Sequence, residues 1–246
     1  MSSVNYYKAD LHIHTCLSPC ADLDMTPLRI INAAVARGLQ IIAISDHNSA
    51  ENTAVAVATG IDHGITVLPA MELTSQEEAH VLALFDSAEN ILAMQEIIYG
   101  SLQSGVNDEI GIGYQLVVNE LDEILDYNKR LLIGATSLSL GELVRNIHSF
   151  GGIAIASHID RHSFSVLSQL GFIPDDVAFD ALEISYSMGM EEATSRFGSY
   201  KGIPWLTSSD AHSLGDVGRK YTTFLLQEPS FSEISLALKG EREMRF

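Results

Sequence analysis

Cysteine is scarce in this sequence, whose 246 residues include only Cys16 and Cys20. Two cysteines are too few for a disulfide scaffold, and the cytosol keeps such thiols reduced. Long apolar runs are also missing, since none reaches the about 18 residues that a membrane span requires. The chain does not open with a charged segment followed by an apolar one, so we expect no signal peptide. These absences predict a cytoplasmic protein without disulfides or a membrane segment.

Basic residues are also few, with 14 Lys and Arg against 32 Asp and Glu, which gives a formal net charge of −18. Exposed acidic groups repel a phosphate backbone, so this charge argues against nucleic acid as a partner. Acidic side chains that cluster inside a protein can instead bind cations, which neutralise their charge. The composition is therefore compatible with a metal-binding protein.

What the sequence does contain is an alternation of strand-like and helix-like segments. Hydrophobic residues make up 46% of the chain and the mean hydropathy is +0.15, as in ordinary globular proteins. Residues 40–45 form a continuous apolar run, which is typical of a strand buried on both faces. Thr26 and Pro27 predict the start of a helix, and Gly38 predicts its end. A first strand is predicted to end in residues 10–15, and further strands are predicted at 65–71, 79–85, 152–157, 180–185, 203–209 and 221–226. Further helices are predicted at 51–59, 190–197 and 230–238.

This alternation predicts an α/β fold with a parallel sheet built from βαβ units. Residues 90–150 interrupt it, because 91–102, 116–127 and 140–150 have mixed apolar spacings with no convincing strand between them. We interpret this segment as a helical insertion, since it is too short for a large core of its own and no Pro- or Ser-rich linker bounds it. Residues 1–246 are accordingly predicted to form a single barrel domain.

The first candidate for chemistry is the stretch Asp10-Leu11-His12-Ile13-His14-Thr15, at the end of the first predicted strand. Residues two apart in a strand point to the same face, so His12 and His14 can aim their imidazoles at one point, with Leu11 and Ile13 packed behind them. Two converging imidazoles form half of a transition-metal site. Because the pattern alone also fits a half-buried strand with two polar residues, residues further along the chain decide between the two interpretations.

Further candidate ligands stand at the C-terminal ends of later predicted strands, the edge at which parallel barrels build their sites. Imidazole and carboxylate ligands without a thiolate cage suit zinc, iron or manganese. Their number exceeds what one ion needs, and a carboxylate such as Glu72 can bridge two ions about 3.5–4 Å apart, as in enzymes that hydrolyse phosphate esters. The candidates are His47, Glu72, His158, Asp210 and His212, together with His80, which comes near the start of its own strand.

In their order along the chain these motifs resemble those of the PHP (polymerase and histidinol phosphatase) family. The resemblance implies a distorted (β/α)7-type barrel that holds two or three divalent metal ions. It also implies phosphoesterase activity, which among family members acts on histidinol phosphate, nucleotides, phosphotyrosine or DNA ends. The segments that carry it are residues 10–15, Ser45-Asp46-His47, Glu72 with His80, Ser157-His158 and residues 208–212, and they span most of the chain.

The resemblance also implies a set of ligands for each ion. His12, His14, Glu72 and Asp210 resemble the ligands of a first ion, Glu72, His80 and His158 those of a second with Glu72 bridging, and His47 and His212 two ligands of a third. At the third site the chain departs from the family pattern, because Pro19 and Cys20 stand where the family has an Asp or a His. Either Cys20 binds as a thiolate, or Asp22 or Asp24 reaches in, or the third ion is weak or absent.

Several other polar residues lie near these motifs and have weaker functional interpretations. Arg161 follows His158 by three residues and could grip phosphate through two nitrogens, or form a surface salt bridge. His162 could protonate a leaving oxygen, although a structural role is favoured. Asp46 suits the orientation of a ligand imidazole, and Glu183 could be a buried partner of a basic group. Structural roles are expected for His63 and His148, and Arg196, Arg219 and Lys220 are scattered cations.

The leading hypothesis is a metal-dependent phosphatase or phosphodiesterase that acts on a small molecule, such as a nucleotide, a sugar phosphate or an amino-alcohol phosphate. A hydroxide that bridges the ions is the expected nucleophile, with Asp210, His212 and Arg161 as catalytic residues. The alternatives are a nuclease-type phosphodiesterase on nucleic acid ends, a non-catalytic regulatory or metal-storage domain, and hydrolysis of an amide. The sequence does not indicate the oligomeric state.

Overall fold

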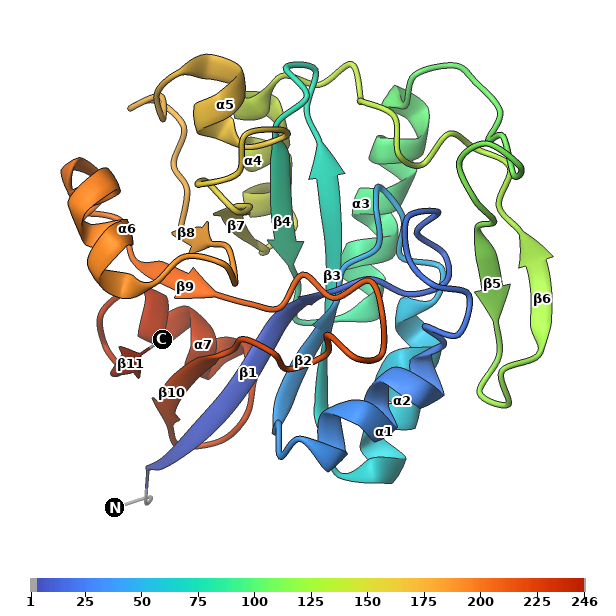
Figure 1. Cartoon of the computed structure of the whole chain (residues 1–246), viewed down its shortest axis with the longest axis horizontal. Helices are drawn as coiled ribbons and strands as arrows, with labels where there is room; N and C mark the ends of the chain where they lie inside the picture. Colours follow the sequence, from blue (N-terminus) through green and yellow to red (C-terminus); the bar gives the residue numbers. More distant parts are fainter. Residues whose placement is uncertain (1–3, 246) are drawn as a thin grey trace.

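The computed structural model describes residues 4–245, and its main feature is a strongly curved nine-stranded sheet with helices around it (Figure 1). The strand order is β11-β10-β1-β2-β3-β4-β7-β8-β9, and β5 and β6 form a separate two-stranded ribbon. The strands are β1 (Asn5–Ile13), β2 (Ile41–Ile44), β3 (Thr66–Thr74), β4 (His80–Leu84), β5 (Leu116–Val118), β6 (Ile124–Tyr127), β7 (Ile153–Ala156), β8 (Ala181–Ile184), β9 (Trp205–Thr207), β10 (Thr222–Leu226) and β11 (Met244–Arg245).

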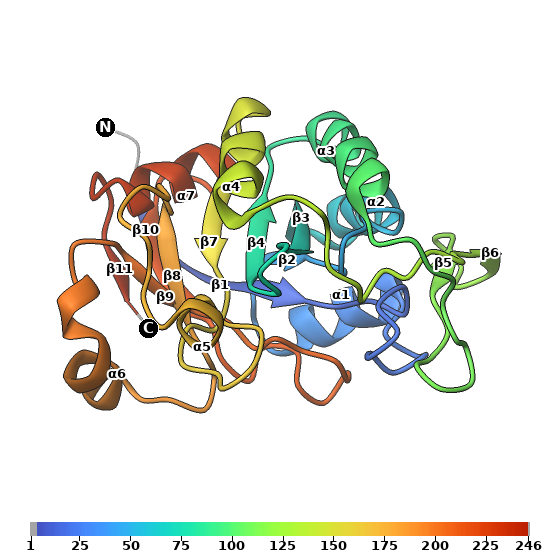
Figure 2. The same ribbon diagram turned by 90° about the horizontal axis from the view of Figure 1, so that it is seen from above.

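The helices lie mostly on the outside of the curved sheet, with α1 and α2 on one flank and α3 and α4 on another (Figure 2). They are α1 (Pro27–Ala36), α2 (Thr53–His63), α3 (Ala88–Ser101), α4 (Leu140–Ser149), α5 (Val166–Leu170), α6 (Met190–Phe197), α7 (Phe231–Leu238) and the short 3-10 helix η1 (Gly198–Tyr200). Pro27 opens α1 as predicted, and Gly38 follows its end with a φ of +70°. Among the residues described, no helix is long and apolar enough to cross a membrane.

The sheet curls until its two ends almost meet, which confirms the predicted barrel-like α/β fold. Beyond β9, Ala211 forms a parallel bridge with Ile13 of β1. The backbone N–H of Thr207 in β9 donates to the hydroxyl of Thr222 in β10 at 2.9 Å. These contacts bring the segment after β9 against β1, so residues from the two ends of the chain meet at one edge of the barrel.

The sheet is mixed, so the prediction of a wholly parallel sheet is wrong. β1, β2 and β3 run parallel to one another, as do β7, β8 and β9, but β4 is antiparallel to both β3 and β7. Only five residues separate β3 from β4, which is room for a hairpin but not for a crossover helix. His80, the first residue of β4, pairs with Thr74 at the end of β3. The start of β4 therefore lies at the same edge as the C-terminal ends of the parallel strands.

Alternate residues of eight strands form a buried apolar cluster, to which α7 also contributes. Ala70 of β3 and Ala181 of β8 belong to it, and two residues further along the same faces stand Glu72 and Glu183. Because side chains two apart share one face, the apolar lining continues into carboxylates at this end of the barrel. Leu11 and Ile13 were predicted to pack together behind His12 and His14, but they lie in different apolar clusters. Leu11 belongs to this one, whereas Ile13 packs among the residues under α1.

The inserted segment contains α3 and α4, as predicted, but residues 116–127 are not helical. They form the β5–β6 hairpin, whose turn is stabilised by the Asn119 side chain as it accepts from the backbone N–H groups of Leu121 and Glu123. A side chain that bonds to nearby backbone in this way competes with helix formation. Leu116 also donates its backbone N–H to the carbonyl of Cys16, which ties the hairpin to the loop after β1.

Candidate metal centre

A cluster of imidazoles and carboxylates lies at the end of the barrel where the parallel strands terminate. His12 and His14 come from the end of β1, His47 follows β2, Glu72 lies near the end of β3 and His80 begins β4. All eight metal ligands predicted from the sequence are in this cluster, and seven are more than nine-tenths buried. The remaining members are His158, which follows β7, and Asp210 and His212, which follow β9. His212 is the one member that is partly exposed.

Glu72 is the centre of the cluster, because its carboxylate faces five imidazoles. Its Oε1 lies 3.3 Å from Nε2 of His12, 3.1 Å from Nδ1 of His80 and 3.1 Å from Nε2 of His158. Its Oε2 lies 3.4 Å from both Nε2 of His14 and Nδ1 of His47. The two oxygens thus face two different groups of nitrogen atoms, as a carboxylate shared between two cations requires.

Asp210 faces the same cluster from the opposite end of the chain. Its Oδ1 lies 3.5 Å from Nε2 of His12 and 3.3 Å from Nε2 of His14, and its Oδ2 lies 2.5 Å from Nη2 of Arg161. Neither oxygen has a partner with hydrogen-bond geometry among the described residues. A buried carboxylate in this state has lone pairs that remain available for a cation.

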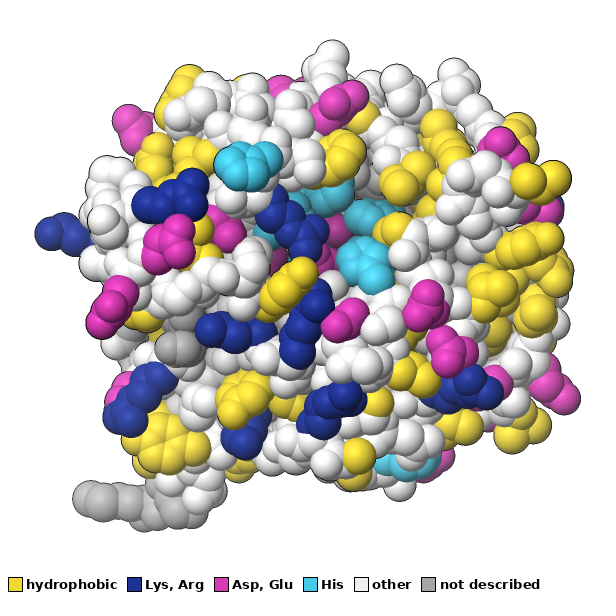
Figure 3. All heavy atoms as spheres, in the orientation of Figure 1, with side chains coloured by type: hydrophobic (Ala, Val, Ile, Leu, Met, Phe, Trp, Pro, Cys, Tyr) yellow, Lys and Arg dark blue, Asp and Glu magenta, His cyan; other side chains and the backbone are white. Residues whose placement is uncertain are grey.

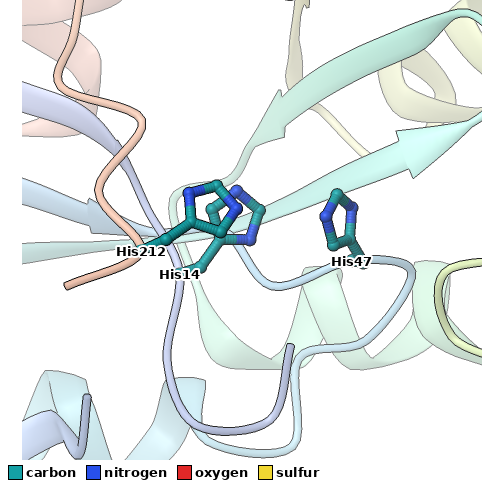
Figure 4. Close-up of side chains that lie close together, drawn as sticks. All are labelled: His14, His47 and His212. Carbon is teal, nitrogen blue, oxygen red and sulfur yellow. The ribbon is translucent and has the colours of Figure 1, made fainter. Parts of the chain in front are cut away.

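Three imidazoles form a second face of the cluster, shown in Figure 4. The ring of His14 stacks on that of His212 with centroids 4.3 Å apart and lies 4.6 Å from that of His47. Nδ1 of His212 contacts the carbonyl of Asp210 at 2.9 Å, which assigns the proton to Nδ1 and leaves Nε2 as the nitrogen that can bind a metal.

Two residues of the cluster have backbone conformations that residues other than glycine rarely adopt. His158 has a φ of +28° and Asp210 a φ of +49°, both at the point where the chain leaves a strand. Such conformations cost of the order of 1–3 kcal/mol each and concentrate at functional sites. At both positions the side chain that follows from this conformation belongs to the cluster.

Carboxylates behind the cluster hold the imidazoles in place. Glu183, buried on β8, accepts from Nδ1 of His12 at 3.0 Å and from the backbone N–H of His158 at 3.0 Å. Asp46 accepts from the Ser18 hydroxyl at 2.7 Å, and that hydroxyl lies 3.0 Å from Nδ1 of His14. A carboxylate partner on the far nitrogen fixes both the orientation and the tautomer of a metal-binding imidazole.

Asp10 performs a related task for the chain that carries Asp210. Its two carboxylate oxygens accept from the backbone N–H groups of Ser209 at 2.9 Å and Gly218 at 2.8 Å. Burial raises its pKa to about 6, although those same hydrogen bonds act in the opposite direction. Sequence patterns did not indicate a separate role for Asp10, because its two hydrogen bonds join it to residues far away along the chain.

The charges of the cluster favour cations. Burial acts to raise the pKa of Glu72, but attraction to His80 and His12 outweighs it and holds the pKa well below its usual value. For His14 burial acts to lower the pKa, but the close carboxylates of Asp210 and Glu72 raise it to about 9. Burial and the neighbouring His14 lower the pKa of His212 to about 4. Burial acts to raise the pKa of Asp210, but attraction to His12 outweighs it and holds that pKa well below its usual value. Both carboxylates therefore stay anionic, and without an ion the cluster holds a proton in its place.

The donor set fits divalent metal ions. His14, His47 and His212 place three nitrogens within 4.8 Å of one another, as do the ligand atoms of His12, His14 and Asp210, and those of His47, Glu72 and His80. Nδ1 atoms of His47, His80 and His158 are buried without a hydrogen-bond partner in the described part of the chain. Imidazole with carboxylate is the ligand chemistry of zinc, manganese and iron. Several such ions can be held, although these groups share His14 and His47 in a way the sequence did not predict.

Other candidate residues lie at different places. Arg161 is at the mouth of the cluster, whereas the neighbouring His162 is exposed and lines an adjoining hollow. His63 binds the carbonyl of Thr59, and His148 pairs with Asp180 at 2.8 Å, so neither belongs to the centre. Arg219 donates to the carbonyl of Ser209 and stacks on Tyr186, which places this cation behind the segment that carries Asp210.

The opening of the centre is a cavity of about 180 Å³. Two of its walls are apolar: Phe164, whose ring stacks on that of His80 at 4.9 Å, and Ile133 from the inserted segment. Sequence patterns did not single out either residue, because both lie in irregular segments. The cavity is lined by Cys20, His47, Glu72, His80, Ile133, His158, Arg161, Phe164, Asp210 and His212.

Comparison with known proteins agrees with this geometry. Residues 10–178 match the PHP domain family model, and residues 195–242 match the model of the PHP-associated region. YqxK of Bacillus subtilis (strain 168), an uncharacterized protein, is 34% identical over 108 residues, a stretch that covers 42% of this chain and 28% of YqxK. The chain thus matches only a minor part of that relative.

Two solved structures illustrate the shared fold. The lesion-specific endonuclease PfuEndoQ from Pyrococcus furiosus superposes with a TM-score of 0.77 at 19% identity, over 98% of this chain and 58% of PfuEndoQ. A candidate metal-dependent phosphoesterase from Bifidobacterium adolescentis superposes with a TM-score of 0.61 at 18% identity, over 94% of this chain and 96% of its own. Because the first family model covers more than half of the sequence and includes six of the eight predicted ligands, this chain belongs to the PHP domain family.

Proposed function

We propose that this protein is a metal-dependent phosphoesterase that hydrolyses a phosphate ester of a small molecule. The observation that carries the proposal is the position of Glu72, with five imidazoles within 3.4 Å of its two oxygens and Asp210 facing two of the same rings. Divalent cations in such a centre lower the pKa of water and offset the charge that develops on phosphoryl oxygens.

The residues at the mouth suit the handling of a phosphate group. Arg161 is partly exposed and presents a planar guanidinium, which can hold two phosphate oxygens at once. Oδ2 of Asp210 faces the same opening and can accept a proton from the water that attacks phosphorus. His212 stays neutral near pH 7 because its pKa is lowered to about 4, so its Nε2 can act as a ligand rather than as a charge.

The size and lining of the cavity support a small substrate. Its volume of about 180 Å³ has room for a phosphate group and a short part of the group attached to it. Phe164 and Ile133 supply apolar walls for that attached group, and both are more than one-third exposed at the opening. A ring on the leaving group could stack on Phe164, a contact worth about 0.5–1.5 kcal/mol.

A phosphodiester at a nucleic acid end is the second candidate. It is favoured by the fold likeness to PfuEndoQ, which is described as a lesion-specific endonuclease. It is also favoured by the basic side chains that gather on the face where the histidines open to the surface (Figure 3). Arg161 and Arg196 line one hollow of the surface, and Arg219 and Lys220 line another. The net charge of −18 counts against it.

The experiment is a substrate comparison with protein reconstituted with zinc, manganese or iron. Rates are measured on p-nitrophenyl phosphate, mononucleotides, sugar phosphates and single-stranded oligonucleotides, with His14→Ala as the matched inactive variant. We expect the small phosphate esters to be hydrolysed and His14→Ala to lose at least about 100-fold in kcat/KM, the scale of a lost catalytic contact. A preference for oligonucleotides selects the second candidate, and equal rates for parent and variant refute both.

A further inference from the structure

The loop between β1 and α1 carries the residue that distinguishes this metal centre, Cys20. Of the two cysteines, Cys16 is fully buried and its thiol faces the carbonyl of Leu116 at 3.8 Å. Cys20 is exposed and lines the same cavity as His47 and His212. The two thiols thus occupy different environments although four residues separate them.

This loop is fixed in position by contacts to the three residues of the second face, one through its imidazole and two through their backbone. The Ser18 hydroxyl lies 3.0 Å from Nδ1 of His14 and accepts from the backbone N–H of His47 at 3.1 Å. The backbone N–H of Asp22 donates to the carbonyl of His212 at 2.8 Å. Cys20 lies between Ser18 and Asp22, so both sides of it are held against the residues that surround the cavity.

The inserted segment also contacts this loop, at the residue immediately before Cys20. A side-chain carbon at Gly113 would lie only 2.2 Å from the carbonyl oxygen of Pro19, so the two backbones are in direct contact there. Gly113 also has a φ of +133°, which residues with a side chain rarely adopt. The residue immediately before Cys20 therefore has little freedom to move outward.

The cavity that Cys20 lines is also lined by a residue with an unsatisfied ligand atom, His47. His47 is 5% exposed, and its Nδ1 is buried without a hydrogen-bond partner among the described residues, although Oε2 of Glu72 lies 3.4 Å away. With His14 and His212 it forms a group of three nitrogens within 4.8 Å (Figure 4). Three nitrogens leave one position of a four-coordinate ion for another ligand.

The acidic alternatives in this loop point elsewhere. Asp24 lies 3.5 Å from Arg29 and lines a separate hollow together with Leu116 and Asp122. Asp22 is exposed and is absent from the lining of the cavity that contains the imidazoles. Of the three side chains that the sequence offered for this position, Cys20 is the one at the cavity.

We propose that Sγ of Cys20 is the fourth protein ligand of an ion held by His14, His47 and His212. A site with three imidazoles and one thiolate selects zinc or another thiophilic ion over manganese and magnesium. This inference rests on the metal centre of the proposed function but not on hydrolysis, because ligation is a property of binding.

The test is cobalt(II) binding to the ion-free full chain, followed by absorption spectroscopy. A thiolate bound to cobalt(II) produces a charge-transfer band in the near ultraviolet, and Cys16 and Cys20 are the only possible sources of it in this sequence. We expect the charge-transfer band in the parent and in Cys16→Ser, and we expect Cys20→Ser to lack it. By elemental analysis, we expect Cys20→Ser to bind one equivalent of zinc less than the parent. Circular dichroism and thermal melting establish that each variant is folded.

Two results would overturn the proposal. One is a parent protein that binds a full complement of cobalt without a charge-transfer band, and the other is a band that persists in Cys20→Ser. A parent protein that shows the band but hydrolyses no phosphate ester would leave Cys20 as a ligand and refute the proposed function instead. In Cys20→Asp, an oxygen replaces sulfur, so we expect metal binding without the band and a shift of preference from zinc toward manganese.

Discussion

Arg161 and Asp210 form a contact of 2.5 Å between Nη2 and Oδ2, although 49 residues separate them in the sequence. The other oxygen of Asp210 faces His12 and His14, so one carboxylate connects the partly exposed cation to the buried imidazoles. An ion bound at Asp210 would compete for this carboxylate and release the guanidinium toward the cavity. Under the proposed function, the pair would therefore link metal binding to phosphate recognition.

Arg161→Ala should weaken substrate binding without reducing the bound metal. A charge-assisted hydrogen bond contributes about 1.5–3 kcal/mol, so we expect kcat/KM for a phosphate ester to fall about 10- to 150-fold, mainly through KM. Steady-state kinetics and elemental analysis of the same samples measure both quantities. Arg196→Ala is the matched control, since Arg196 is paired with Glu192 at the surface. Loss of metal in Arg161→Ala would contradict the assigned role.

Glu183→Gln should lower metal affinity although Glu183 faces the far nitrogen of His12. The change removes the negative charge that holds this imidazole, and such outer partners are worth about 10- to 100-fold in affinity. Competition with a chromophoric chelator measures the change, with Glu192→Gln as a surface control. Unchanged affinity in a folded Glu183→Gln protein would show that Glu183 only packs beside His12.

Phe164→Ala should affect aromatic substrates more than aliphatic ones. If the leaving group stacks on this ring, KM for p-nitrophenyl phosphate rises about 2- to 10-fold, the equivalent of 0.5–1.5 kcal/mol, while KM for glycerol phosphate stays the same. Phe172→Ala is the control, because Phe172 is also exposed but does not line the cavity. Equal increases for both substrates would indicate displacement of His80 instead of lost stacking.

Metal affinity should rise with pH. In the ion-free protein the pKa of His14 is raised from 6.5 to about 9, so a proton must leave its ring before a cation can bind. For this one proton we expect affinity to increase by up to about tenfold per pH unit until pH reaches about 9. Calorimetric titration in buffers of different ionisation enthalpy measures the released protons. Binding that releases none would contradict the prediction.

The same shift predicts how the stability of the ion-free protein depends on pH. The raised pKa of His14 contributes stability that is fully present below pH 6.5 and is lost as pH rises through about 9. We expect the melting temperature of the ion-free protein to fall across this range and that of the zinc-loaded protein to change less. Parallel thermal scans of the two forms provide the comparison, and identical pH profiles would refute the assignment.

The residues of the cluster were predictable from the sequence because each has a chemically distinctive side chain next to an apolar run. His80 was the exception, since it begins its strand, and the reversal of β4 resolves this by bringing its start beside the end of β3. That reversal depends on a five-residue connection whose length, not its composition, excludes a crossover helix. Secondary-structure patterns alone did not contain this information.

The supporting residues were harder to predict, because their partners are distant in sequence. Glu183 lies 171 residues from His12, and Asp10 lies 199 residues from Ser209. The hairpin at residues 116–127 was missed because its apolar spacing also suits a helix, and the competing Asn119 side-chain bonds are local details of the turn. Residues of the cluster were therefore easier to identify than the residues that position them.

The most direct test of the central claim is the rate of phosphate ester hydrolysis as metal is returned to the ion-free protein. Zinc, manganese or iron is added in fractions of an equivalent, and the initial rate on p-nitrophenyl phosphate is measured at each step. Because the two oxygens of Glu72 face separate groups of imidazoles, we expect little activity from the first equivalent and a steep rise with the second. Full activity with one equivalent, or with none in the presence of a chelator, would contradict the account.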